Sequence, residues 1–439
     1  MGLIAASAAL ILLSAFLALN WAVVGASGYW AQARVFPAGR PWAWALAWTA
    51  AAVVTERWTP RLSIDLLGYT QYRYLALIQL GALAGPHALG FLLVGLNASL
   101  AQVWKSLAAK RGASPAPLAL ALGLLGAVFI WGRIRLDAKA ASSPDVVRVE
   151  ILQPVVDQYQ KWNPLFAAEI FRNFTGLLAA PRATRPDLVV WPESALPELV
   201  YEDQPLPLAS EAGRKLGAWQ AVGVVSEDRA RRLYSAALLL DAEGKARGSY
   251  HKRQLVPFGE YIPPGFGWLR SWIGILNELG GVTPGEAAQP LLPTPLGLTA
   301  VSLCYEAVFP RWANFDAGRG ARAIINLTND GWYKDTWGPY QHFQTNVFRA
   351  VENGVTVIRA GNTGISAVID PWGRVTARLD LNVRGRLDAS VPRDDPFPDR
   401  TFYARHGDWF GLSCVAMAFL LSVAGMLKPG RPIIRTSGH

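Results

Sequence analysis

The sequence predicts a membrane protein in which a bundle of transmembrane helices is joined to one layered α/β sandwich domain. Of the 439 residues, 51% are hydrophobic and only 17% are charged, which is too apolar for an ordinary soluble protein of this size. Long uncharged stretches lie toward both ends of the chain. Between them the pattern changes to short β-branched runs that alternate with helical stretches, as expected for an α/β domain.

Five uncharged stretches predict the membrane helices, since about 20 apolar residues are needed to cross a bilayer. Four precede the polar region, in a domain covering residues 1–136, and one follows it; they cover residues 1–33, where the first charged residue is Arg34, and residues 41–55, 74–104, 112–132 and 409–427. The second is short, so Arg40 and Glu56 are expected to reach the two interfaces. The third contains Gly85-Pro86-His87, which favours a re-entrant or interfacial piece. A signal peptide at residues 1–27 is the competing interpretation, but it lacks a basic start and is too long.

Basic residues at the ends of these stretches predict the orientation. The net charge is +10. Basic residues form three groups at the predicted membrane edges, namely Arg34 and Arg40; Lys105, Lys110 and Arg111; and Lys428, Arg431 and Arg435. Because cytoplasmic loops are rich in Lys and Arg, all three groups are expected on the cytoplasmic side, which places the polar region outside, in the periplasm of a diderm bacterium. No basic cluster is interleaved with aromatic residues, so nucleic acid is not an expected partner.

The polar region, residues 146–395, is predicted to fold as one α/β domain. Its strand-like runs are residues 146–152, 188–191, 218–225, 233–240, 298–303, 323–327, 355–359 and 365–369. Its helical stretches are residues 164–180, 207–216, 307–316 and 340–353. Residues 138–145 and 392–399 have the composition of linkers, and residues 409–427 form the helix that follows the domain.

Cys304 is the candidate nucleophile of this domain. The chain has two cysteines, and the other, Cys414, lies in a hydrophobic stretch, so a disulfide within the polar region is excluded. Cys304 follows an apolar run and precedes a helix predicted from Ala307. Backbone N–H groups and the helix dipole at such a junction favour a thiolate, which predicts a thiol pKa below the usual value of about 8.5.

Glu193 and Lys252 follow other strand-like runs, as active-site groups commonly do. A glutamate can remove the thiol proton and return it to a leaving group, and a lysine can stabilise an oxyanion. The backbone N–H of Tyr305 is a candidate second oxyanion donor. Each residue also has an inert interpretation, with Cys304 as a small buried hydrophobic residue and the other two as loop charges.

A cysteine–histidine hydrolase is the main mechanistic alternative. Of the five histidines, only His251 and His342 lie within the polar region away from the membrane stretches. Neither has an obvious orienting partner in the sequence. The residues alone therefore indicate a thiol enzyme, with Glu193 preferred as its base.

The neighbours of these residues resemble a known family. Trp-Pro-Glu193-Ser, Lys252 with Leu-Val-Pro-Phe-Gly-Glu260, and Cys304-Tyr305-Glu306 resemble the Glu–Lys–Cys triad of the nitrilase superfamily. Together with the membrane stretches, they make the chain similar to the apolipoprotein N-acyltransferases of the bacterial inner membrane. Further matching segments are Leu67–Gln71, Leu327–Trp332, Gly338–Gln344 and Tyr403–Trp409.

The resemblance implies a nitrilase-like αββα sandwich and a role for each matching residue. Glu193 would be the general base, Lys252 the oxyanion stabiliser and Cys304 the acyl-carrying nucleophile. Active-site support would come from Glu260, Tyr305 and Glu306. Trp162 matches, more loosely, a position near the substrate. Substrate contact is also expected from Phe266 and Trp268, in an apolar arm over residues 258–275 that reaches the membrane interface; the other interpretation of this arm is core packing.

The implied reaction moves an acyl chain between two lipid-anchored substrates. A phospholipid donor acylates Cys304, and the N-terminal amine of a diacylglyceryl-modified apolipoprotein then takes the acyl group, with no metal or organic cofactor. Family members carry more membrane helices before the catalytic domain than the four predicted here, so a shortened N-terminal part is expected.

Two other functions remain open at this point. A membrane-anchored amidase or nitrilase that hydrolyses small C–N substrates would use the same triad and need no lipid. A catalytically inactive envelope scaffold would leave Cys304 unreactive toward thiol probes.

Overall fold

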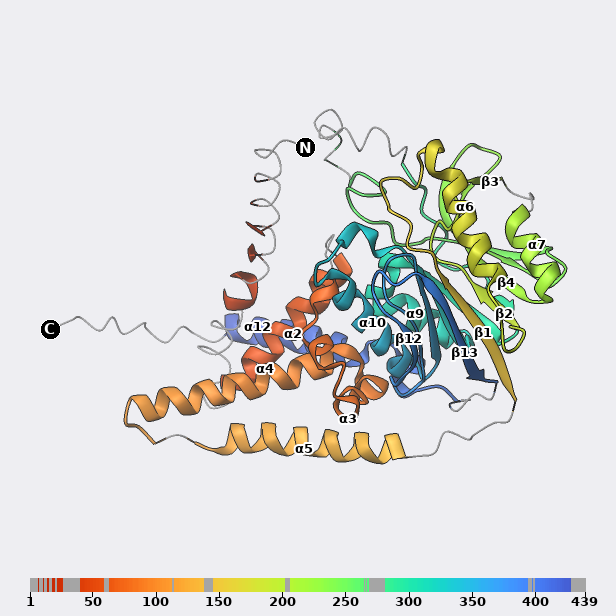
Figure 1. The fold of residues 1–439 in the computed structure, drawn as a ribbon. Helices are drawn as coiled ribbons and strands as arrows, with labels where there is room; N and C mark the ends of the chain where they lie inside the picture. Colours follow the sequence, from red (N-terminus) through yellow and green to blue (C-terminus); the bar gives the residue numbers. More distant parts are fainter. Residues whose placement is uncertain are drawn as a thin grey trace. The chain divides into compact units, whose positions relative to one another are not determined.

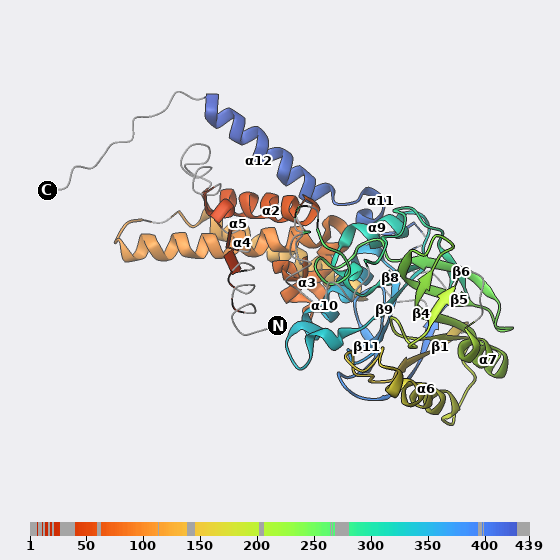
Figure 2. The same ribbon diagram turned by 90° about the horizontal axis from the view of Figure 1, so that it is seen from above.

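The computed structural model describes residues 40–58, 63–112, 114–137, 145–201, 206–263, 281–393 and 399–427, and a few isolated residues outside these ranges. The chain divides into two compact units. The first contains the chain up to residue 61, residues 87–129 and the chain from residue 408. The second contains residues 62–86 and 130–407. Figures 1 and 2 show their helices and strands.

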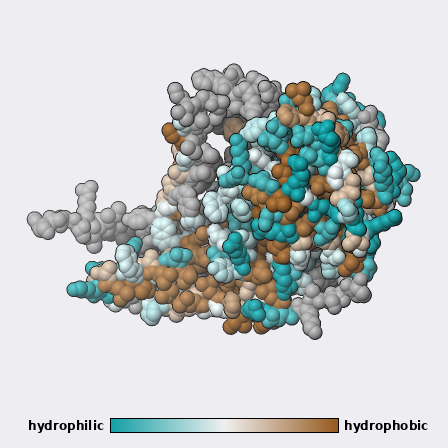
Figure 3. All heavy atoms as spheres, viewed as in Figure 1, coloured by the Kyte–Doolittle hydropathy of each residue, from teal (hydrophilic) through white to brown (hydrophobic). Residues whose placement is uncertain are grey.

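The first unit is helical. It contains α2 (Arg40–Trp58), α12 (Trp409–Leu427) and the greater parts of α4 (Leu80–Ala108) and α5 (Ala116–Asp137). Among the described residues, α4 and α5 are long and apolar enough to cross a membrane, and residues 409–425 of α12 form a shorter apolar helix. Large apolar side chains lie exposed along α5, as Figure 3 shows, including Leu120, Leu122 and Phe129.

The predicted stretch 74–104 is not one straight helix. It contains the short helix α3 (Leu75–Ile78) and then α4, which is kinked at Gly85, where φ is 74° and ψ is −178°. Pro86 follows and has no N–H to offer to the preceding turn, so the Gly-Pro pair breaks the helix where the sequence predicted an interruption.

Glu56 was expected at a membrane interface, but the structure buries it beside His87. His87 Nε2 lies 3.1 Å from a Glu56 carboxylate oxygen, and its Nδ1 lies 3.3 Å from Asp408. All three side chains are buried, and Arg57 approaches Asp408 at 3.8 Å. The imidazole thus lies between two carboxylates, and these contacts join α2, α4 and the start of α12.

Replacing His87 with leucine is expected to destabilise the first unit by about 3–5 kcal/mol, because two buried carboxylates would lose the group between them. The measurement is the thermal unfolding midpoint of the purified protein in detergent. Arg133→Ala on α5, whose side chain is largely exposed, is the control and should shift the midpoint little. An unchanged midpoint for His87→Leu would show that the cluster adds nothing to stability.

The second unit contains two β-sheets. The first has the order β13-β1-β2-β4-β5-β6, with β3 also paired to β4, and consists of β1 (Val146–Gln153), β2 (Leu188–Val190), β3 (Leu199–Tyr201), β4 (Trp219–Glu227), β5 (Leu233–Leu240), β6 (Ala246–His251) and β13 (Gly385–Pro392). The second has the order β12-β11-β10-β9-β8-β7 and consists of β7 (Leu292–Thr294), β8 (Gly297–Leu303), β9 (Ala323–Thr328), β10 (Thr356–Gly361), β11 (Ser366–Ile369) and β12 (Val375–Leu379). Strands β1, β2 and β4 are parallel, as are β8, β9 and β10.

The two sheets pack face to face, with helices on their outer faces (Figure 1). Alternate residues of β1, such as Val149 and Ile151, share one apolar core with Leu303 and Ile325 of the second sheet. The other face of the first sheet packs on α6 (Pro164–Ala179) and α7 (Pro207–Leu216). The second sheet packs on α9 (Pro310–Gly318) and α10 (Gly338–Asn353). The unit is therefore an αββα sandwich, as the resemblance implied.

Several short elements complete the second unit. They are η1 (Ser63–Asp65), η2 (Leu67–Gln71), η4 (Cys304–Val308), η5 (Asp330–Tyr333) and α11 (Phe402–His406). The predicted helix over residues 307–316 is wrong at its start, because the chain first makes the 3-10 turn η4 and α9 begins only at Pro310, whose ring suits the first helical turn.

Five strands of the described part of the chain were not predicted. β3 and β7 have three residues each, too few to show a period. β12 and β13 lie at the edges of the sheets, most of their residues are at least partly exposed, and polar residues such as Arg378 and Asp388 interrupt their apolar ones. β6 is short and carries Arg, Gly and Ser. The predicted linker over residues 392–399 begins too early by one residue, since Pro392 still pairs with Val146 of β1.

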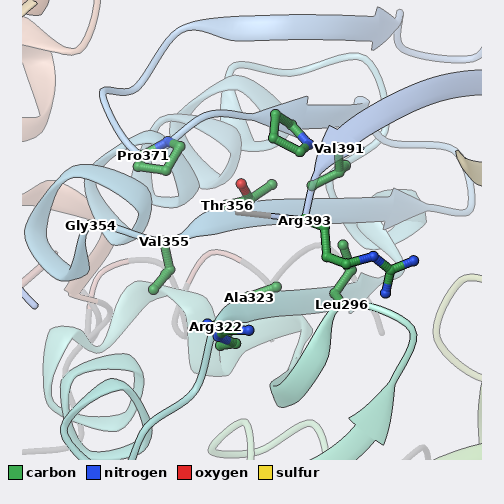
Figure 4. Close-up of a pocket in the computed structure, with 10 residues that line it drawn as sticks. Leu296, Arg322, Ala323, Gly354, Val355, Thr356, Pro371, Val391 and Arg393 are labelled. Carbon is green, nitrogen blue, oxygen red and sulfur yellow. The ribbon is translucent and has the colours of Figure 1, made fainter. Parts of the chain in front are cut away.

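A pocket lies where β9 and β10 begin, shown in Figure 4, and its lining includes Arg322, Ala323, Val355, Thr356, Val391 and Arg393. None of the candidate catalytic residues lines it. Ligands of open α/β sheets bind at the carboxyl ends of parallel strands, which is the opposite end of β9 and β10. A substrate site is therefore expected at the other end of the sheets, where the parallel strands end.

Candidate active site

The three candidate catalytic residues each follow the end of a strand. Glu193 comes after β2, Lys252 directly follows β6, and Cys304 directly follows β8. All three are buried, with relative exposures of 7%, 1% and 8%. Strands from both sheets thus supply them, and the stacking of the sheets brings together groups that lie more than a hundred residues apart in the sequence.

Lys252 lies between two carboxylates. Its Nζ donates to Glu193 Oε1 at 3.0 Å and to Glu260 Oε1 at 2.6 Å. The other oxygen of Glu260 accepts the backbone N–H of Val256 at 2.8 Å, which fixes the loop after β6. Ser235 on β5 also lies near Glu193 Oε1, at 3.4 Å. The sequence placed Glu260 eight residues from Lys252, and the loop turns it back onto the ammonium.

The two carboxylates around Lys252 determine its charge. Burial alone disfavours the ammonium, but the carboxylates of Glu193 and Glu260 outweigh burial and raise the pKa of Lys252 well above its ordinary value. Lys252 is therefore a fixed cation at neutral pH. Such a cation suits electrostatic stabilisation of an oxyanion rather than proton transfer.

Cys304 differs from expectation in its acidity. The sequence predicted a lowered thiol pKa, whereas burial, followed by the negative charge of Glu193, raises the pKa of Cys304 to about 12, despite the opposing effect of Lys252. The helix that was to favour the thiolate begins only at Pro310, six residues on. At neutral pH the thiol is therefore protonated, so it would need a base in order to act as a nucleophile.

This acidity predicts how a neutral alkylating reagent reacts. The rate of Cys304 alkylation by iodoacetamide is expected to rise about tenfold per pH unit between pH 7 and 9, because the thiolate fraction grows by that factor when the pH is well below the pKa. Mass spectrometry of the Cys304 peptide measures the rate, with the Cys304→Ala protein as the background. A plateau near pH 8.5 would contradict the raised pKa.

Glu306 holds the nucleophile turn against the loop that carries Lys252. Its carboxylate accepts the Tyr250 hydroxyl at 2.8 and 2.9 Å and the backbone N–H groups of Arg253 at 2.6 Å, Gln254 at 3.1 Å and Leu303 at 2.8 Å. Tyr305, the residue between Cys304 and Glu306, is buried and packs edge-on against Phe309. Glu306 is thus a structural support that links the ends of β6 and β8.

The backbone of Cys304 is in an unusual conformation. Its φ is 44°, in the left-handed region that residues with a Cβ rarely adopt. A strained backbone conformation of this kind persists only where contacts with the surrounding structure stabilise it. Such conformations are common at active sites. At the sheet end this conformation turns the chain abruptly from β8 into η4.

Lys161 was not singled out from the sequence. It is buried, and its Nζ donates to the backbone carbonyl of Glu193 at 3.0 Å. Burial lowers the pKa of Lys161 to about 8, although Glu193 opposes the effect. A lysine between Gln160 and Trp162 gives no sequence signal of burial, so only the fold could identify it. Lys161 holds the segment that carries the candidate base.

His342 now has the orienting partner that the sequence could not show. Its Nδ1 lies 2.8 Å from Asp330 Oδ1, and its Nε2 lies 2.9 Å from the carbonyl oxygen of Cys304. Asp330 also accepts Arg359 at 2.6 Å. Burial opposes its ionisation, but the charge of Arg359 and the hydrogen bond with His342 outweigh burial and lower the pKa of Asp330 to about 2. Both ring nitrogens thus face oxygen acceptors of the protein, which argues against His342 as the base for the thiol.

The side chains of Cys304, Asp330 and His342 are close enough together to be tested as a metal site. The Cys304 thiol, a carboxylate oxygen of Asp330 and a ring nitrogen of His342 lie within 4.8 Å of one another. However, each ring nitrogen is directed to a protein oxygen and the second Asp330 oxygen accepts Arg359. A ligand set already engaged in this way, beside a guanidinium, does not favour a cation, and we assign no metal here.

The remaining predicted residues lie at the edge of this site or outside the described structure. Trp162 directly follows the buried Lys161 and is half exposed. Phe266 and Trp268 lie outside the described residues.

Comparison with known proteins shows the relatives of this chain. Residues 150–395 match the carbon-nitrogen hydrolase family. An apolipoprotein N-acyltransferase of Geobacter metallireducens is 35% identical over 371 residues, which is 81% of this chain and 68% of the relative. One from Agrobacterium fabrum is 41% identical over 317 residues, 69% of this chain and 58% of the relative. A carbon-nitrogen hydrolase structure from Helicobacter pylori has a TM-score of 0.40 and 16% identity, covering 64% of this chain and 99% of that one.

These relatives cover both the catalytic sandwich and much of the chain around it. The family match extends over the whole region that carries Glu193, Lys252 and Cys304. The chain therefore belongs to the apolipoprotein N-acyltransferase family, a group of acyltransferases built on the carbon-nitrogen hydrolase fold.

Proposed function

We propose that this protein transfers a fatty acyl chain from a phospholipid, through a thioester on Cys304, to the N-terminal amine of a diacylglyceryl-modified apolipoprotein. The observation that carries the proposal is the buried triad at the end of the two sheets, in which Lys252 bridges Glu193 and Glu260 beside the Cys304 thiol. Relatives named apolipoprotein N-acyltransferase support an apolipoprotein as the acceptor.

The first half-reaction uses Glu193 as the base. Glu193 takes the proton of Cys304 as the sulfur attacks the ester carbonyl of the phospholipid, and an oxyanion forms. Lys252 and the Tyr305 N–H stabilise that oxyanion. The tetrahedral intermediate then expels the lysophospholipid oxygen, which takes the proton back from Glu193, and the acyl group remains on Cys304 as a thioester.

The second half-reaction reverses these roles. The neutral N-terminal amine of the apolipoprotein attacks the thioester, Glu193 accepts an amine proton, and the Cys304 sulfur leaves and is reprotonated. An α-amino group has a pKa of about 7.7–8.0, so a useful fraction is neutral at working pH and a carboxylate base suffices. The burial of the triad supports transfer over hydrolysis, because excluding water protects the thioester. Glu260 and Glu306 hold the two loops in place, and Trp162, Phe266 and Trp268 are proposed to contact the lipid substrates.

Location in the membrane is part of the proposal. The exposed apolar side chains along α5, with the length and composition of α4 and α5, support a multi-pass protein of the bacterial inner membrane. The sandwich would face the periplasm, in accordance with the basic residues predicted to be cytoplasmic. Both substrates are anchored in the bilayer, so anchoring the triad there raises their effective concentration.

The decisive experiment separates the acyltransferase from a small-amide hydrolase. Purified protein is incubated with phospholipid in detergent and its intact mass is measured; we expect a gain of one fatty acyl group that hydroxylamine removes. The acyl-enzyme is then mixed with a diacylglyceryl-cysteine peptide. Loss of the acyl group to the peptide amine would support the proposal, whereas no acyl-enzyme together with turnover of soluble amides would favour the hydrolase.

A further inference from the structure

His342 has no role in the triad chemistry, although it is completely buried and touches the nucleophile residue. It comes from α10, which packs against η4, the turn that begins at Cys304. Its two ring nitrogens lie 2.8 Å from an Asp330 carboxylate oxygen and 2.9 Å from the Cys304 carbonyl oxygen. A carbonyl oxygen can only accept, so Nε2 is the donor in the second contact.

The other side of the ring is fixed by a network that has no contact with solvent. Asp330 Oδ2 accepts Arg359 at 2.6 Å, and Arg359 donates to Asn326 Oδ1 at 2.7 Å. Arg359 also approaches His342 Nδ1 at 3.3 Å, but its shorter bond is to the carboxylate. These side chains come from η5, β10 and β9, so the rigid second sheet determines the direction of the imidazole.

We infer that His342 is a positioning residue that orients the oxyanion-binding N–H of Tyr305. The carbonyl oxygen of Cys304 and the N–H of Tyr305 belong to one planar trans peptide and point in opposite directions. A donor that fixes the carbonyl on one side therefore fixes the N–H on the other. The left-handed φ of 44° at Cys304 shows that this peptide needs support, and His342 supplies it.

This role explains why a buried histidine lies beside a catalytic cysteine without acting as its base. With Nε2–H directed to the carbonyl and Nδ1 directed to Asp330, the ring has no lone pair facing the thiol. Its effect on the reaction passes through one backbone N–H, which matters only when a carbonyl substrate becomes tetrahedral. Alkylation of the same sulfur forms no oxyanion and should not depend on His342.

Two substitutions of His342 distinguish its hydrogen bond to the Cys304 carbonyl from its contact with Asp330. His342→Gln keeps a donor near the position of Nε2, so the bond to the Cys304 carbonyl is retained. His342→Asn keeps a donor near the position of Nδ1 and loses that bond. Both variants are uncharged and remove the ring, so a role in packing alone, or in charge alone, would affect them alike.

The test compares two reactions of Cys304 in each purified variant. The first is acylation by p-nitrophenyl butyrate, which needs an oxyanion site whether or not phospholipid is the natural donor. The second is alkylation by iodoacetamide at fixed pH. In His342→Asn we expect acylation to fall about 10²–10³-fold, the usual loss for one oxyanion donor, with alkylation within about threefold of the unmodified protein. In His342→Gln we expect acylation to fall less than about tenfold.

The inference rests on Cys304 being an acyl-carrying nucleophile, which the nitrophenyl ester tests separately from the lipid substrate. Normal ester acylation without phospholipid acylation in the unmodified protein would contradict the proposed donor and leave the His342 comparison valid. Equal losses of acylation and alkylation in His342→Asn would overturn the inference, because His342 would then act on the thiol or on the fold. Unchanged acylation in that variant would also overturn it.

Discussion

Replacing Cys304 with alanine is expected to remove the acyl-enzyme altogether and to lower acyl transfer by roughly 10⁴-fold or more, the scale of loss of a covalent nucleophile. Ser235, a described hydroxyl near the triad, is not expected to take over. Ser235 lies 3.4 Å from Glu193, but it is on β5 of the other sheet, and Glu193 already accepts from Lys252. The measurement is the intact mass after incubation with phospholipid, together with the amount of N-acylated peptide formed.

The second cysteine supplies a matched control. Cys414 is also buried, but it lies in α12 of the first unit, so Cys414→Ala should retain acylation. Cys304→Ser keeps the shape of the site and should retain the fold while losing most of the activity, because a hydroxyl is a much weaker nucleophile than a thiol at its ordinary pKa. An acyl-enzyme that persists in Cys304→Ala would place the intermediate elsewhere and contradict the proposed chemistry.

Replacing Lys252 with methionine is expected to have two large effects. Acylation should fall by about 10²–10³-fold or more, because the cation that stabilises the oxyanion is lost. The second unit should also lose about 3–5 kcal/mol of stability, because the buried Glu193 and the partly buried Glu260 would lose their cation. From the sequence alone one would expect such a variant to fold normally, since Lys252 reads as an exposed loop lysine.

A double variant separates the two effects. Lys252→Met with Glu260→Gln removes one of the stranded charges, so part of the stability should return while acylation stays low. Thermal unfolding and the acyl-enzyme mass measure the two quantities on the same sample. Recovered acylation in the double variant would mean that Lys252 serves the fold only, and an unaltered unfolding midpoint in Lys252→Met would mean that the buried pairs are weaker than their distances indicate.

Local sequence predicted the main strands well where they are buried on both faces. β1, β4, β5 and β9 consist of apolar and β-branched runs, because each of them contacts a core on both sides. The strands that were missed, such as β12 and β13, are held by pairing and expose polar side chains. Their hydrogen bonds leave no mark on the side-chain pattern.

Glu193, Lys252 and Cys304 could be proposed as a site from the sequence, because the chemistry requires their residue types and motifs surround each of them. Lys161 and His342 could not be assigned roles in the same way. Each acts through a backbone carbonyl, of Glu193 and of Cys304 respectively, and a carbonyl is present at every residue. Only the three-dimensional path of the chain shows which carbonyl a side chain reaches.

The sequence by itself determined that the chain carries apolar helices beside an α/β domain, and it predicted the three side chains that we propose form and resolve a thioester. Only the tertiary structure decided their ionisation. Cys304 was expected to be acidic from its place after a strand, yet burial beside Glu193 raises its pKa to about 12, and Lys252 became a fixed cation because two carboxylates meet it in the interior. The physical reason is that the pKa of a group depends on its solvation and on charges within a few ångströms, and these come from strands far apart in the sequence.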